Sequence, residues 1–197
     1  MERRRAETRG EIISAAWELA RETGLVPLSV RRLAQRVGMR APSLYSYFAS
    51  KDAIYDAMFA EGQIQLARTI DAYRQPSRAG LRAATHAFFD FCVSDPVRYQ
   101  LMFQRTIPGF EPTPESYALA IDNLERIRAQ LVSAGITSSQ HHDLWTAIVT
   151  GLVAQQMSNE PEGRRWRDLV DEAVDVFSDH TGLVDEPEST SDNKEPT

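Results

Sequence analysis

Signals that start and stop α-helices recur along the whole chain, and they limit its fold more than any other feature of the sequence. Ser29 and Ser50 are residue types that cap helix N-termini, and each stands directly before a segment with apolar residues at helical spacing. Gly24 and Gly38 follow such segments, at positions where glycine commonly ends a helix. Convincing alternation of apolar and polar residues, which marks a half-buried strand, is missing from the sequence. We therefore expect an all-α fold.

The N-terminal segment has the pattern of an amphipathic helix. Thr8 and Glu11 have the spacing of a capping box, in which each side chain bonds the other residue's backbone N–H. The apolar residues that follow recur at helical spacing and predict one buried face: Ile12, Ile13, Ala16, Leu19 and Ala20. The first helix is therefore expected to begin at Thr8 and to end near Gly24.

Proline and glycine mark further helix boundaries in the rest of the chain. Asp95-Pro96 and Thr113-Pro114 each combine an N-cap residue with proline at the first helical position. Gly135 is expected to end the helix that begins near Pro114, and Glu160-Pro161 separates the last two helices. In the last helix, apolar residues repeat every three to four positions and predict a buried face: Trp166, Leu169, Val170, Ala173, Val176 and Phe177.

The bulk composition is that of an ordinary globular protein, with 42% hydrophobic and 25% charged residues among 197. No apolar run approaches the ~20 residues of a membrane helix, and no apolar export signal follows the N-terminal arginines. The single Cys92 cannot form an intramolecular disulfide, so it is expected to be a small buried residue in a reducing compartment. These features predict a cytoplasmic protein that has no membrane partner.

Charge is distributed unevenly along the chain. Residues 1–52 carry ten basic and six acidic side chains, a net charge of +4, whereas the remainder carries twelve basic and twenty-two acidic, a net charge of −10. A basic head on an acidic body indicates that one end of the molecule meets a polyanion. The segment 184–197 is acidic and poor in aromatic residues, so we expect it to be disordered.

The segment 28–54, LSVRRLAQRVGMRAPSLYSYFASKDAI, is the most informative part of the sequence. It predicts two short helices separated by a tight glycine turn at Gly38, which is the helix-turn-helix geometry. Ala34 is small where the helices must pack closely, and Leu33 and Leu44 supply a buried side. Polar, basic and aromatic residues remain for the other side, where they can enter a major groove: Arg31, Arg40, Ser43, Tyr45, Tyr47 and Lys51.

At these residues the sequence closely resembles the TetR family of bacterial regulators. The matching positions follow the order and spacing of that family's DNA-binding motif: Ser29-Val30, Leu33-Ala34, Gly38, Ser43-Leu44-Tyr45, Tyr47-Phe48 and Ser50-Lys51-Asp52. The resemblance covers about residues 8–60. It implies about nine helices, with a three-helix helix-turn-helix head over residues 1–52 and a helical body for effector binding and dimerisation over residues 53–183.

The resemblance also implies which residues contact DNA. The third short helix, roughly Arg40 to Tyr47, corresponds to the recognition helix, and Lys51 corresponds to a phosphate contact. The full set of expected DNA-binding residues is Ser29, Arg31, Arg40, Ala41, Pro42, Ser43, Tyr45, Ser46, Tyr47 and Lys51. Pro42 stands where many members carry glycine, and Arg40 replaces a commonly small residue, so the operator sequence does not follow. Arg3, Arg4 and Arg5 are either an arm with further phosphate contacts or a solvated terminus.

The resemblance in the body is thinner. The stretch Asp95 to Phe103, DPVRYQLMF, together with Trp145 and Gly151-Leu152, is similar to one C-terminal subfamily, which often has histidine where this chain has Thr150. The aromatic residues of the body either fill an ordinary core or line a pocket for an apolar or aromatic effector, with His86, Asn123 and Gln156 as possible polar contacts. The expected ligand-binding residues are Phe88, Phe91, Tyr99, Met102, Phe103, Tyr117, Trp145, Val149 and Gln155.

Trp166 through Phe177 could be internal core, but in the resembled family the last two long helices form the dimer interface. The expected interface residues are Leu152, Gln156, Trp166, Leu169, Val170, Ala173 and Phe177. A homodimer suits a small head that must reach two half-sites about 34–36 Å apart on DNA.

The resemblance implies a ligand-responsive transcription regulator, a repressor that binds a palindromic double-stranded DNA operator and is released by a small-molecule effector. A transcriptional activator with the same head and a helical protein-interaction module are the alternatives. No catalytic Ser/His/Asp order or phosphate-binding glycine loop stands out, so we expect no enzyme and no cofactor. His141 and His142 project about 100° apart on a helix, which suits a shared metal poorly, so we expect no metal site.

Overall fold

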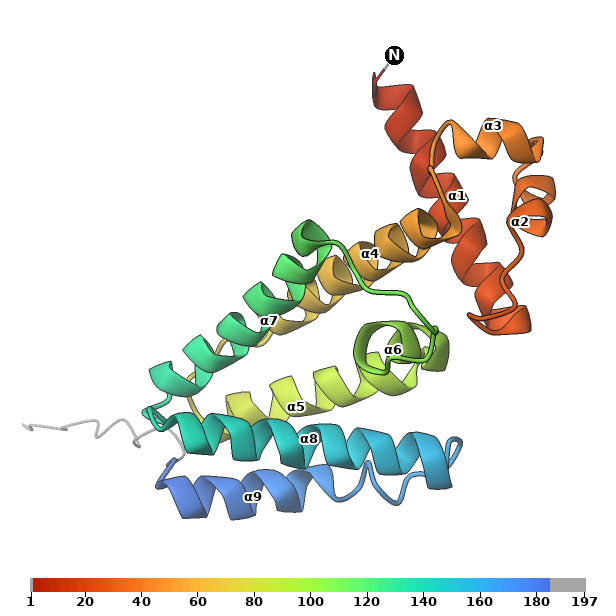
Figure 1. Cartoon of the computed structure of the whole chain (residues 1–197). Helices are drawn as coiled ribbons and strands as arrows, with labels where there is room; N and C mark the ends of the chain where they lie inside the picture. The colour runs from red at the N-terminus through yellow and green to blue at the C-terminus, as the bar shows by residue number, and fades with distance from the viewer. Residues whose placement is uncertain (1, 185–197) are drawn as a thin grey trace, which may run out of the picture.

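A computed structural model of the chain describes residues 2–184, which form nine α-helices and no strand (Figure 1). The helices are α1 (Glu2–Thr23), α2 (Val30–Arg36), α3 (Ala41–Tyr45), α4 (Lys51–Asp71), α5 (Arg78–Val93), α6 (Pro96–Phe103), α7 (Pro114–Ser133), α8 (Ser139–Asn159) and α9 (Val170–Thr181). The all-α prediction is therefore confirmed. None of the helices in this range is both long and apolar enough to span a bilayer. The predicted disorder of the tail concerns residues that, apart from Val184, lie outside the described range.

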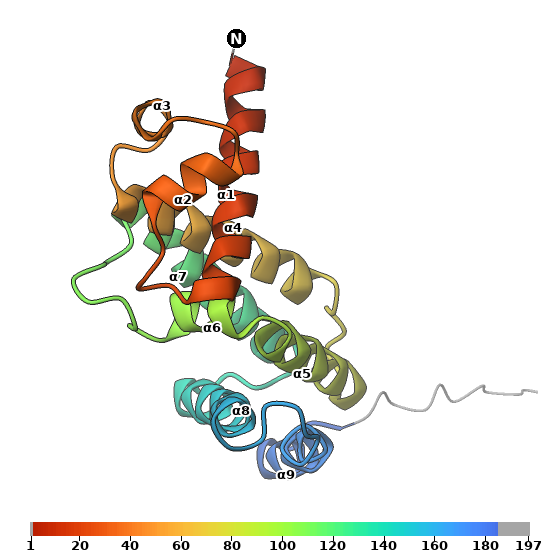
Figure 2. The ribbon, with the colours of Figure 1, turned by 90° about the vertical axis from the view of Figure 1, so that its right-hand side faces the viewer.

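Helices α1, α2 and α3 gather at one end of the molecule, and α4 leads from them into the body (Figures 1 and 2). Their apolar faces meet in one head core, to which Leu33, Leu44 and Phe48 contribute fully buried side chains. The first half of α4 joins the same core through Ile54 and Met58. The predicted boundary after residue 52 thus falls at the start of a helix whose first half completes the head core.

The local helix signals position these elements as the sequence predicts. Ser29 and Ser50 accept hydrogen bonds from Arg32 N–H at 3.4 Å and Ala53 N–H at 3.0 Å, and so cap α2 and α4. The N-cap residues of α6 and α7 act in the same way, with proline at the first position of each helix. Gly38 follows α2 with φ +68°, a left-handed conformation that glycine adopts without steric cost.

Two predicted helix starts are wrong. Helix α1 begins at Glu2, and Thr8 lies inside it, where its hydroxyl donates to the Arg4 carbonyl at 3.0 Å instead of capping the helix. The residues before Thr8 are mostly strong helix formers, so the helix extends past the capping signal. Helix α9 begins at Val170, so Trp166 lies before it; the amide of Gln156 bonds the Glu160 and Gly163 carbonyls and holds the intervening chain in turns.

In the body, α4 and α7 lie side by side (Figure 1). Residue numbers rise together on both helices from one polar contact to the next, which shows that the helices run in the same direction. Ser116 donates to Asp56 at 2.9 Å, the amide of Asn123 donates to the Gln63 carbonyl at 2.9 Å, and that of Gln130 donates to the Ile70 carbonyl at 2.9 Å. The contacts recur every seven residues on each helix, about two helical turns. These three interhelical hydrogen bonds fix the register of the two helices.

Helix α9 packs against α5 through a row of ion pairs. The residues of α5 in this row are four positions apart and share one face; their partners are three aspartates of α9, also four positions apart, and Arg167, which precedes α9. The pairs are Arg78–Asp179, Arg82–Asp175, His86–Asp171 and Arg167–Asp90. The hydrogen bond from Arg167 lowers the pKa of the Asp90 carboxyl. Since such partly exposed pairs stabilise little individually, the apolar contacts beneath them carry most of the packing.

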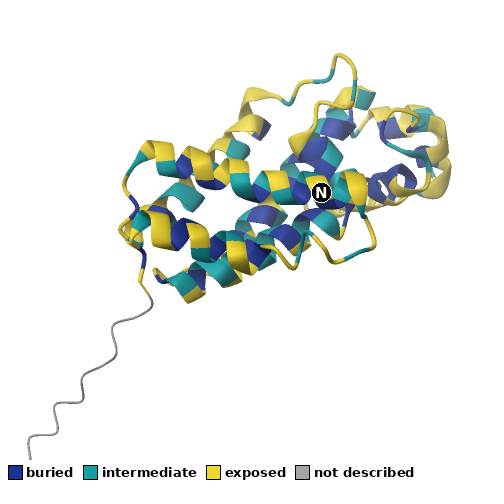
Figure 3. Cartoon of the chain, turned by 90° about the horizontal axis from the view of Figure 1, so that it is seen from below, coloured by how far each residue is buried: buried dark blue, intermediate teal, exposed yellow. Residues whose placement is uncertain are grey.

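Buried and exposed residues alternate around the body helices, whose buried sides meet in the interior (Figure 3). Cys92 of α5 lies in this interior with its side chain buried and unbonded to another cysteine. Burial raises the pKa of the Cys92 thiol to about 12, so the reactive thiolate is almost absent near neutral pH. This environment agrees with the predicted structural role.

Candidate nucleic-acid interface and effector cavity

Helix α3 lies at the outer edge of the head, on the side away from the body (Figure 2). Leu44 anchors it in the head core with no exposed surface, and Phe48 anchors the turn that follows. The neighbouring Tyr45 projects outward with 49% of its surface exposed. The start of the helix, including Arg40 and Ser43, is exposed as well. The arrangement presents the leading end of α3 to a partner.

The expected DNA-contact residues divide by exposure. Six are exposed: Arg31, Arg40, Pro42, Ser43, Tyr45 and Ser46. Four are half-buried: Ser29, Ala41, Tyr47 and Lys51. The Ser29 hydroxyl also caps α2, where it accepts a backbone hydrogen bond. Nine of the ten lie on α2, α3 or the segments that flank them, and Lys51 is the first residue of α4.

Lys51 has a structural contact that the sequence did not reveal. Its ammonium donates to the Val26 carbonyl at 2.8 Å and lies 5.3 Å from the centre of the Tyr55 ring. The Tyr55 hydroxyl donates to the Leu25 carbonyl at 2.5 Å. Burial, with a smaller contribution from Asp52, raises the pKa of Tyr55 to about 12 and keeps this donor protonated. An ammonium group has three donors, so Lys51 keeps donors for a phosphate.

Two arginines of α1 contact the chain that follows α3, and sequence reasoning missed their role. The guanidinium of Arg5 donates to the Ser46 carbonyl at 2.7 Å, and that of Arg9 donates to the Tyr47 carbonyl. The sequence indicates Arg5 only as part of a possible arm and assigns no contact to Arg9. Their four-residue spacing is visible in the sequence, but nothing local indicates which segment they meet.

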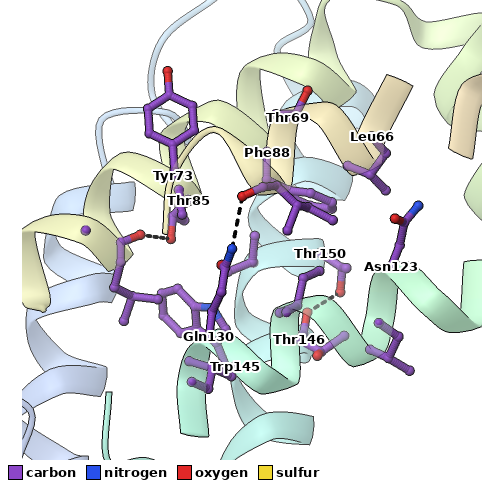
Figure 4. Close-up of a pocket in the computed structure, with 18 of the residues that line it drawn as sticks. Leu66, Thr69, Tyr73, Thr85, Phe88, Asn123, Gln130, Trp145, Thr146 and Thr150 are labelled. Atoms are coloured by element: carbon purple, nitrogen blue, oxygen red, sulfur yellow. Dashed lines mark hydrogen bonds between the residues drawn. The ribbon is translucent and has the colours of Figure 1, made fainter. Parts of the chain in front are cut away.

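A cavity of about 390 Å³ lies in the body and is lined by residues of α4, α5, α6, α7 and α8 (Figure 4). Apolar and aromatic side chains such as Leu66, Phe88 and Trp145 form much of its wall. Polar side chains interrupt that wall: Thr69, Thr85, Asn123, Gln130, Thr146 and Thr150. Among the described residues that line the cavity, none is charged. The cavity therefore suits a neutral molecule, because an unpaired charge is costly in such a site.

The hydrogen bonds of the cavity wall determine what its polar groups still offer. Thr85 and Thr150 donate their hydroxyl protons to carbonyls of their own helices, at 2.6 Å and 2.7 Å (Figure 4). Gln130 donates its amide to the Ile70 carbonyl of α4. Oxygen lone pairs remain on each of these side chains. The wall consequently offers acceptors that match N–H or O–H donors of a ligand.

Six of the nine expected ligand-binding residues line this cavity: Phe88, Met102, Phe103, Tyr117, Trp145 and Val149. The other three do not. Phe91 packs beneath the Arg98 guanidinium, 3.8 Å from its ring centre, and Tyr99 is buried against Phe103. Gln155 is exposed and accepts a hydrogen bond from Asn159. Of the suggested polar contacts, Asn123 lines the cavity, whereas His86 and Gln156 bond elsewhere.

The expected interface residues divide in a similar way. Gln156, Val170 and Phe177 are buried within a single protomer, and Phe177 packs against Trp145 with ring centres 4.6 Å apart. The protomer itself covers these three side chains, and their place at a dimer interface stays a prediction. The remaining four are half-buried or exposed: Leu152, Trp166, Leu169 and Ala173.

Residues 12–58 match the family described as "Bacterial regulatory proteins, tetR family". The matched segment begins at Ile12, a buried residue of α1, and ends at Met58 in α4, so it spans the elements of the head core. Residues 12–58 therefore carry the N-terminal region of the TetR family. A family of DNA-binding regulators also agrees with the expectation that the chain is not an enzyme.

Two curated relatives match this chain over part of its length. The HTH-type transcriptional activator FasR of Mycolicibacterium smegmatis is 36% identical over 107 residues, which cover 51% of this chain and 47% of FasR. The tetracycline repressor protein class D of Escherichia coli is 43% identical over 53 residues, which cover 27% of this chain and 24% of the repressor. The matches thus span less than half of these two relatives.

A solved structure extends the fold comparison beyond the head. The TetR family transcriptional regulator PfmR from Thermus thermophilus aligns with a TM-score of 0.62 at 20% identity. The alignment covers 84% of this chain and 96% of PfmR. The predicted combination of a helix-turn-helix head and a helical body is therefore the fold of this chain.

Substitutions of Leu44 and Tyr45 distinguish the buried side of α3 from its exposed side. Leu44→Ala is expected to lower the free energy of unfolding by ~2–5 kcal/mol, because it opens a cavity in the head core. Tyr45→Ala is expected to change it by less than about 0.5 kcal/mol, because the side chain is largely in solvent. Urea denaturation followed by circular dichroism measures both, and equal losses would contradict the assigned orientation of α3.

Proposed function

We propose that this chain is a homodimeric transcription regulator that binds operator DNA through α3 and responds to a neutral small molecule in the body cavity. The observation that carries the proposal is the presentation of α3, whose leading end is exposed while Leu44 is buried in the head core. A protein of this kind acts in the cytoplasm, where bacterial DNA is found.

The surface chemistry of the head supports DNA binding. Arg31, Arg40, Ser43 and Tyr45 are all exposed, and side chains of these types can make both phosphate and base-edge contacts. The head has a net charge of +4, whereas the rest of the chain has a net charge of −10. The body is therefore repelled by the polyanion that the head attracts, and this favours approach by α3.

Dimerisation is proposed for α8 and α9, which lie at the opposite end of the molecule from the head (Figure 1). Apolar side chains are left exposed there at Leu144 and Val176, the second with 62% of its surface accessible. Leu169, just before α9, is exposed as well. A second copy packed on this face would cover them and place two heads at fixed separation, as a palindromic operator requires.

The effector follows from the chemistry of the cavity. Its uncharged, mostly apolar wall favours a neutral molecule with apolar or aromatic surface. The threonine and glutamine oxygens left without a donor favour a ligand that carries a hydroxyl or N–H group.

Helix α6 is the proposed route from cavity to head. Leu101 belongs to the head core, and the next residue, Met102, lines the cavity. Asp95 caps the start of α6 and also pairs with Arg21 of α1 at 2.6 Å. A ligand that displaces Met102 would therefore shift the contacts of α6 with α1. The ligand changes DNA affinity only to the extent that it binds the original and the shifted arrangement of α6 with different affinity.

Repression is the proposed effect on transcription, with release of DNA on effector binding. Activation is the alternative, since FasR is named an activator and the Escherichia coli relative a repressor. A helical protein-interaction module would leave the exposed leading end of α3 without a function.

Fluorescence anisotropy with the chain's own upstream DNA tests the central proposal. We expect binding by dimers, a clear preference over scrambled DNA, and affinity that falls steeply with salt because bound counterions are released. Light scattering coupled to size exclusion measures the stoichiometry. Absence of preference for any genomic fragment would overturn DNA regulation as the function.

Cavity binding is tested by a substitution that fills the space. Ala84 lines the cavity, whereas the preceding Ala83 of α5 is exposed. Ala84→Phe is expected to lower ligand affinity at least about ten-fold and to leave operator affinity unchanged; Ala83→Phe is the matched control. Thermal-shift screening should find neutral hydroxylated aromatics that stabilise the protein and carboxylate analogues that do not. Stronger stabilisation by the carboxylates would contradict the assigned cavity chemistry.

The Arg21–Asp95 pair is expected to contribute to coupling. Asp95→Asn keeps an oxygen that can cap α6 but removes the charge that faces Arg21, so the effector should change operator affinity a few-fold less than in the parent. Operator affinity is measured with and without saturating effector. Arg128→Gln, which removes a surface pair within α7, is the control. Undiminished coupling in Asp95→Asn would exclude this pair from the route.

A further inference from the structure

Helix α1 continues well beyond the core that it helps to form. Its buried face begins at Ile12, and from Arg3 to Glu11 every residue is exposed except the half-buried Thr8. This N-terminal part stands beside α3 at the end of the head (Figure 2). It has no apolar face that could hold it there, so its position depends on polar contacts.

Those contacts come from Arg5 and Arg9, which share one face of α1 because they are four residues apart. Besides the hydrogen bonds to the Ser46 and Tyr47 carbonyls, each guanidinium lies over an aromatic ring. Arg5 is 5.7 Å from the Tyr47 ring centre, and Arg9 is 4.2 Å from the Phe48 ring centre. Each arginine thus makes one charge-assisted hydrogen bond and one cation–π contact.

Helix α3 needs such support because it is short. It spans five residues, and its N-cap residue, Arg40, makes no side-chain cap bond. Helices of this length are not stable by themselves. Leu44 is its single buried residue, and Ala41 packs only partly against the core, so few core contacts fix the direction of α3. Two positive groups at its C-terminal end satisfy carbonyls there and complement the helix dipole.

We propose that Arg5 and Arg9 are positioning residues that set the angle at which α3 meets DNA and thereby determine operator specificity. The inference rests on the proposed DNA-binding function. The two guanidinium groups hold the trailing end of α3, and a change of angle there displaces Arg40, Pro42 and Ser43 at the leading end. Base-edge contacts depend on that geometry, whereas phosphate contacts tolerate its loss.

Charge-conserving substitutions separate positioning from simple attraction to phosphate. Arg5→Lys with Arg9→Lys keeps both positive charges but replaces the planar guanidinium, which bonds a carbonyl while stacking on a ring. Arg3→Lys with Arg4→Lys is the matched control, since it makes the same change in the same helix at exposed residues outside the Arg5–Arg9 contacts. Thermal denaturation of both variants checks that the head stays folded, and the single variant Arg5→Lys retains the Arg9–Phe48 contact as a milder case.

Affinities for the operator and for scrambled DNA are measured by anisotropy across a salt series. The Arg5/Arg9 variant should lose about ten-fold or more in operator affinity, with scrambled-DNA affinity and salt dependence unchanged. The Arg3/Arg4 control should match the parent in all three. An unchanged operator preference in the Arg5/Arg9 variant would overturn the proposal, as would an equal loss for both DNAs. If the parent protein prefers no DNA, the proposed function has failed rather than the positioning role.

Discussion

Helix α4 packs its first half into the head core and its second half against the body. The positions of the other helices depend on this shared helix. Ile54 and Met58 are inaccessible to solvent beside the residues of the helix-turn-helix, whereas Leu66 and Ile70 line the cavity. A helix is stiff over such a length, so the two ends cannot adjust independently. Any change in the cavity that tilts α4 therefore reaches the head core, in which α3 is anchored.

The parallel pairing of α4 with α7 shows how the body meets that constraint. Gln63 and Asn123 are 2% and 3% exposed, and their amides bond one another across the helix pair. Buried amides are costly when unpaired, so a slip of either helix would break their contacts. Both residues also line the cavity. The same pair thus fixes the helix register and contributes to the surface that a ligand meets.

Charged side chains bond the short helices that have the fewest contacts with the apolar cores. Arg21 ties α1 to the start of the short α6, and Arg5 and Arg9 tie α1 to the trailing end of the short α3. Such contacts are weaker and more exposed than core packing, so the elements that they orient can change position at low cost. In the proposed regulator these are the elements that must move or meet DNA.

The sequence by itself determined the features whose physical cause is local. Ser29 and Ser50 cap helices through bonds to residues three positions ahead, and the spacing from Leu33 to Leu44 specifies the helix-turn-helix within one short segment. Only the tertiary structure decided that Gln156 and Phe177 are core residues, that threonines line the cavity, and that Arg9 meets Tyr47. Each of these depends on helices far apart in the chain, and helical periodicity shows that a face is buried without showing what covers it.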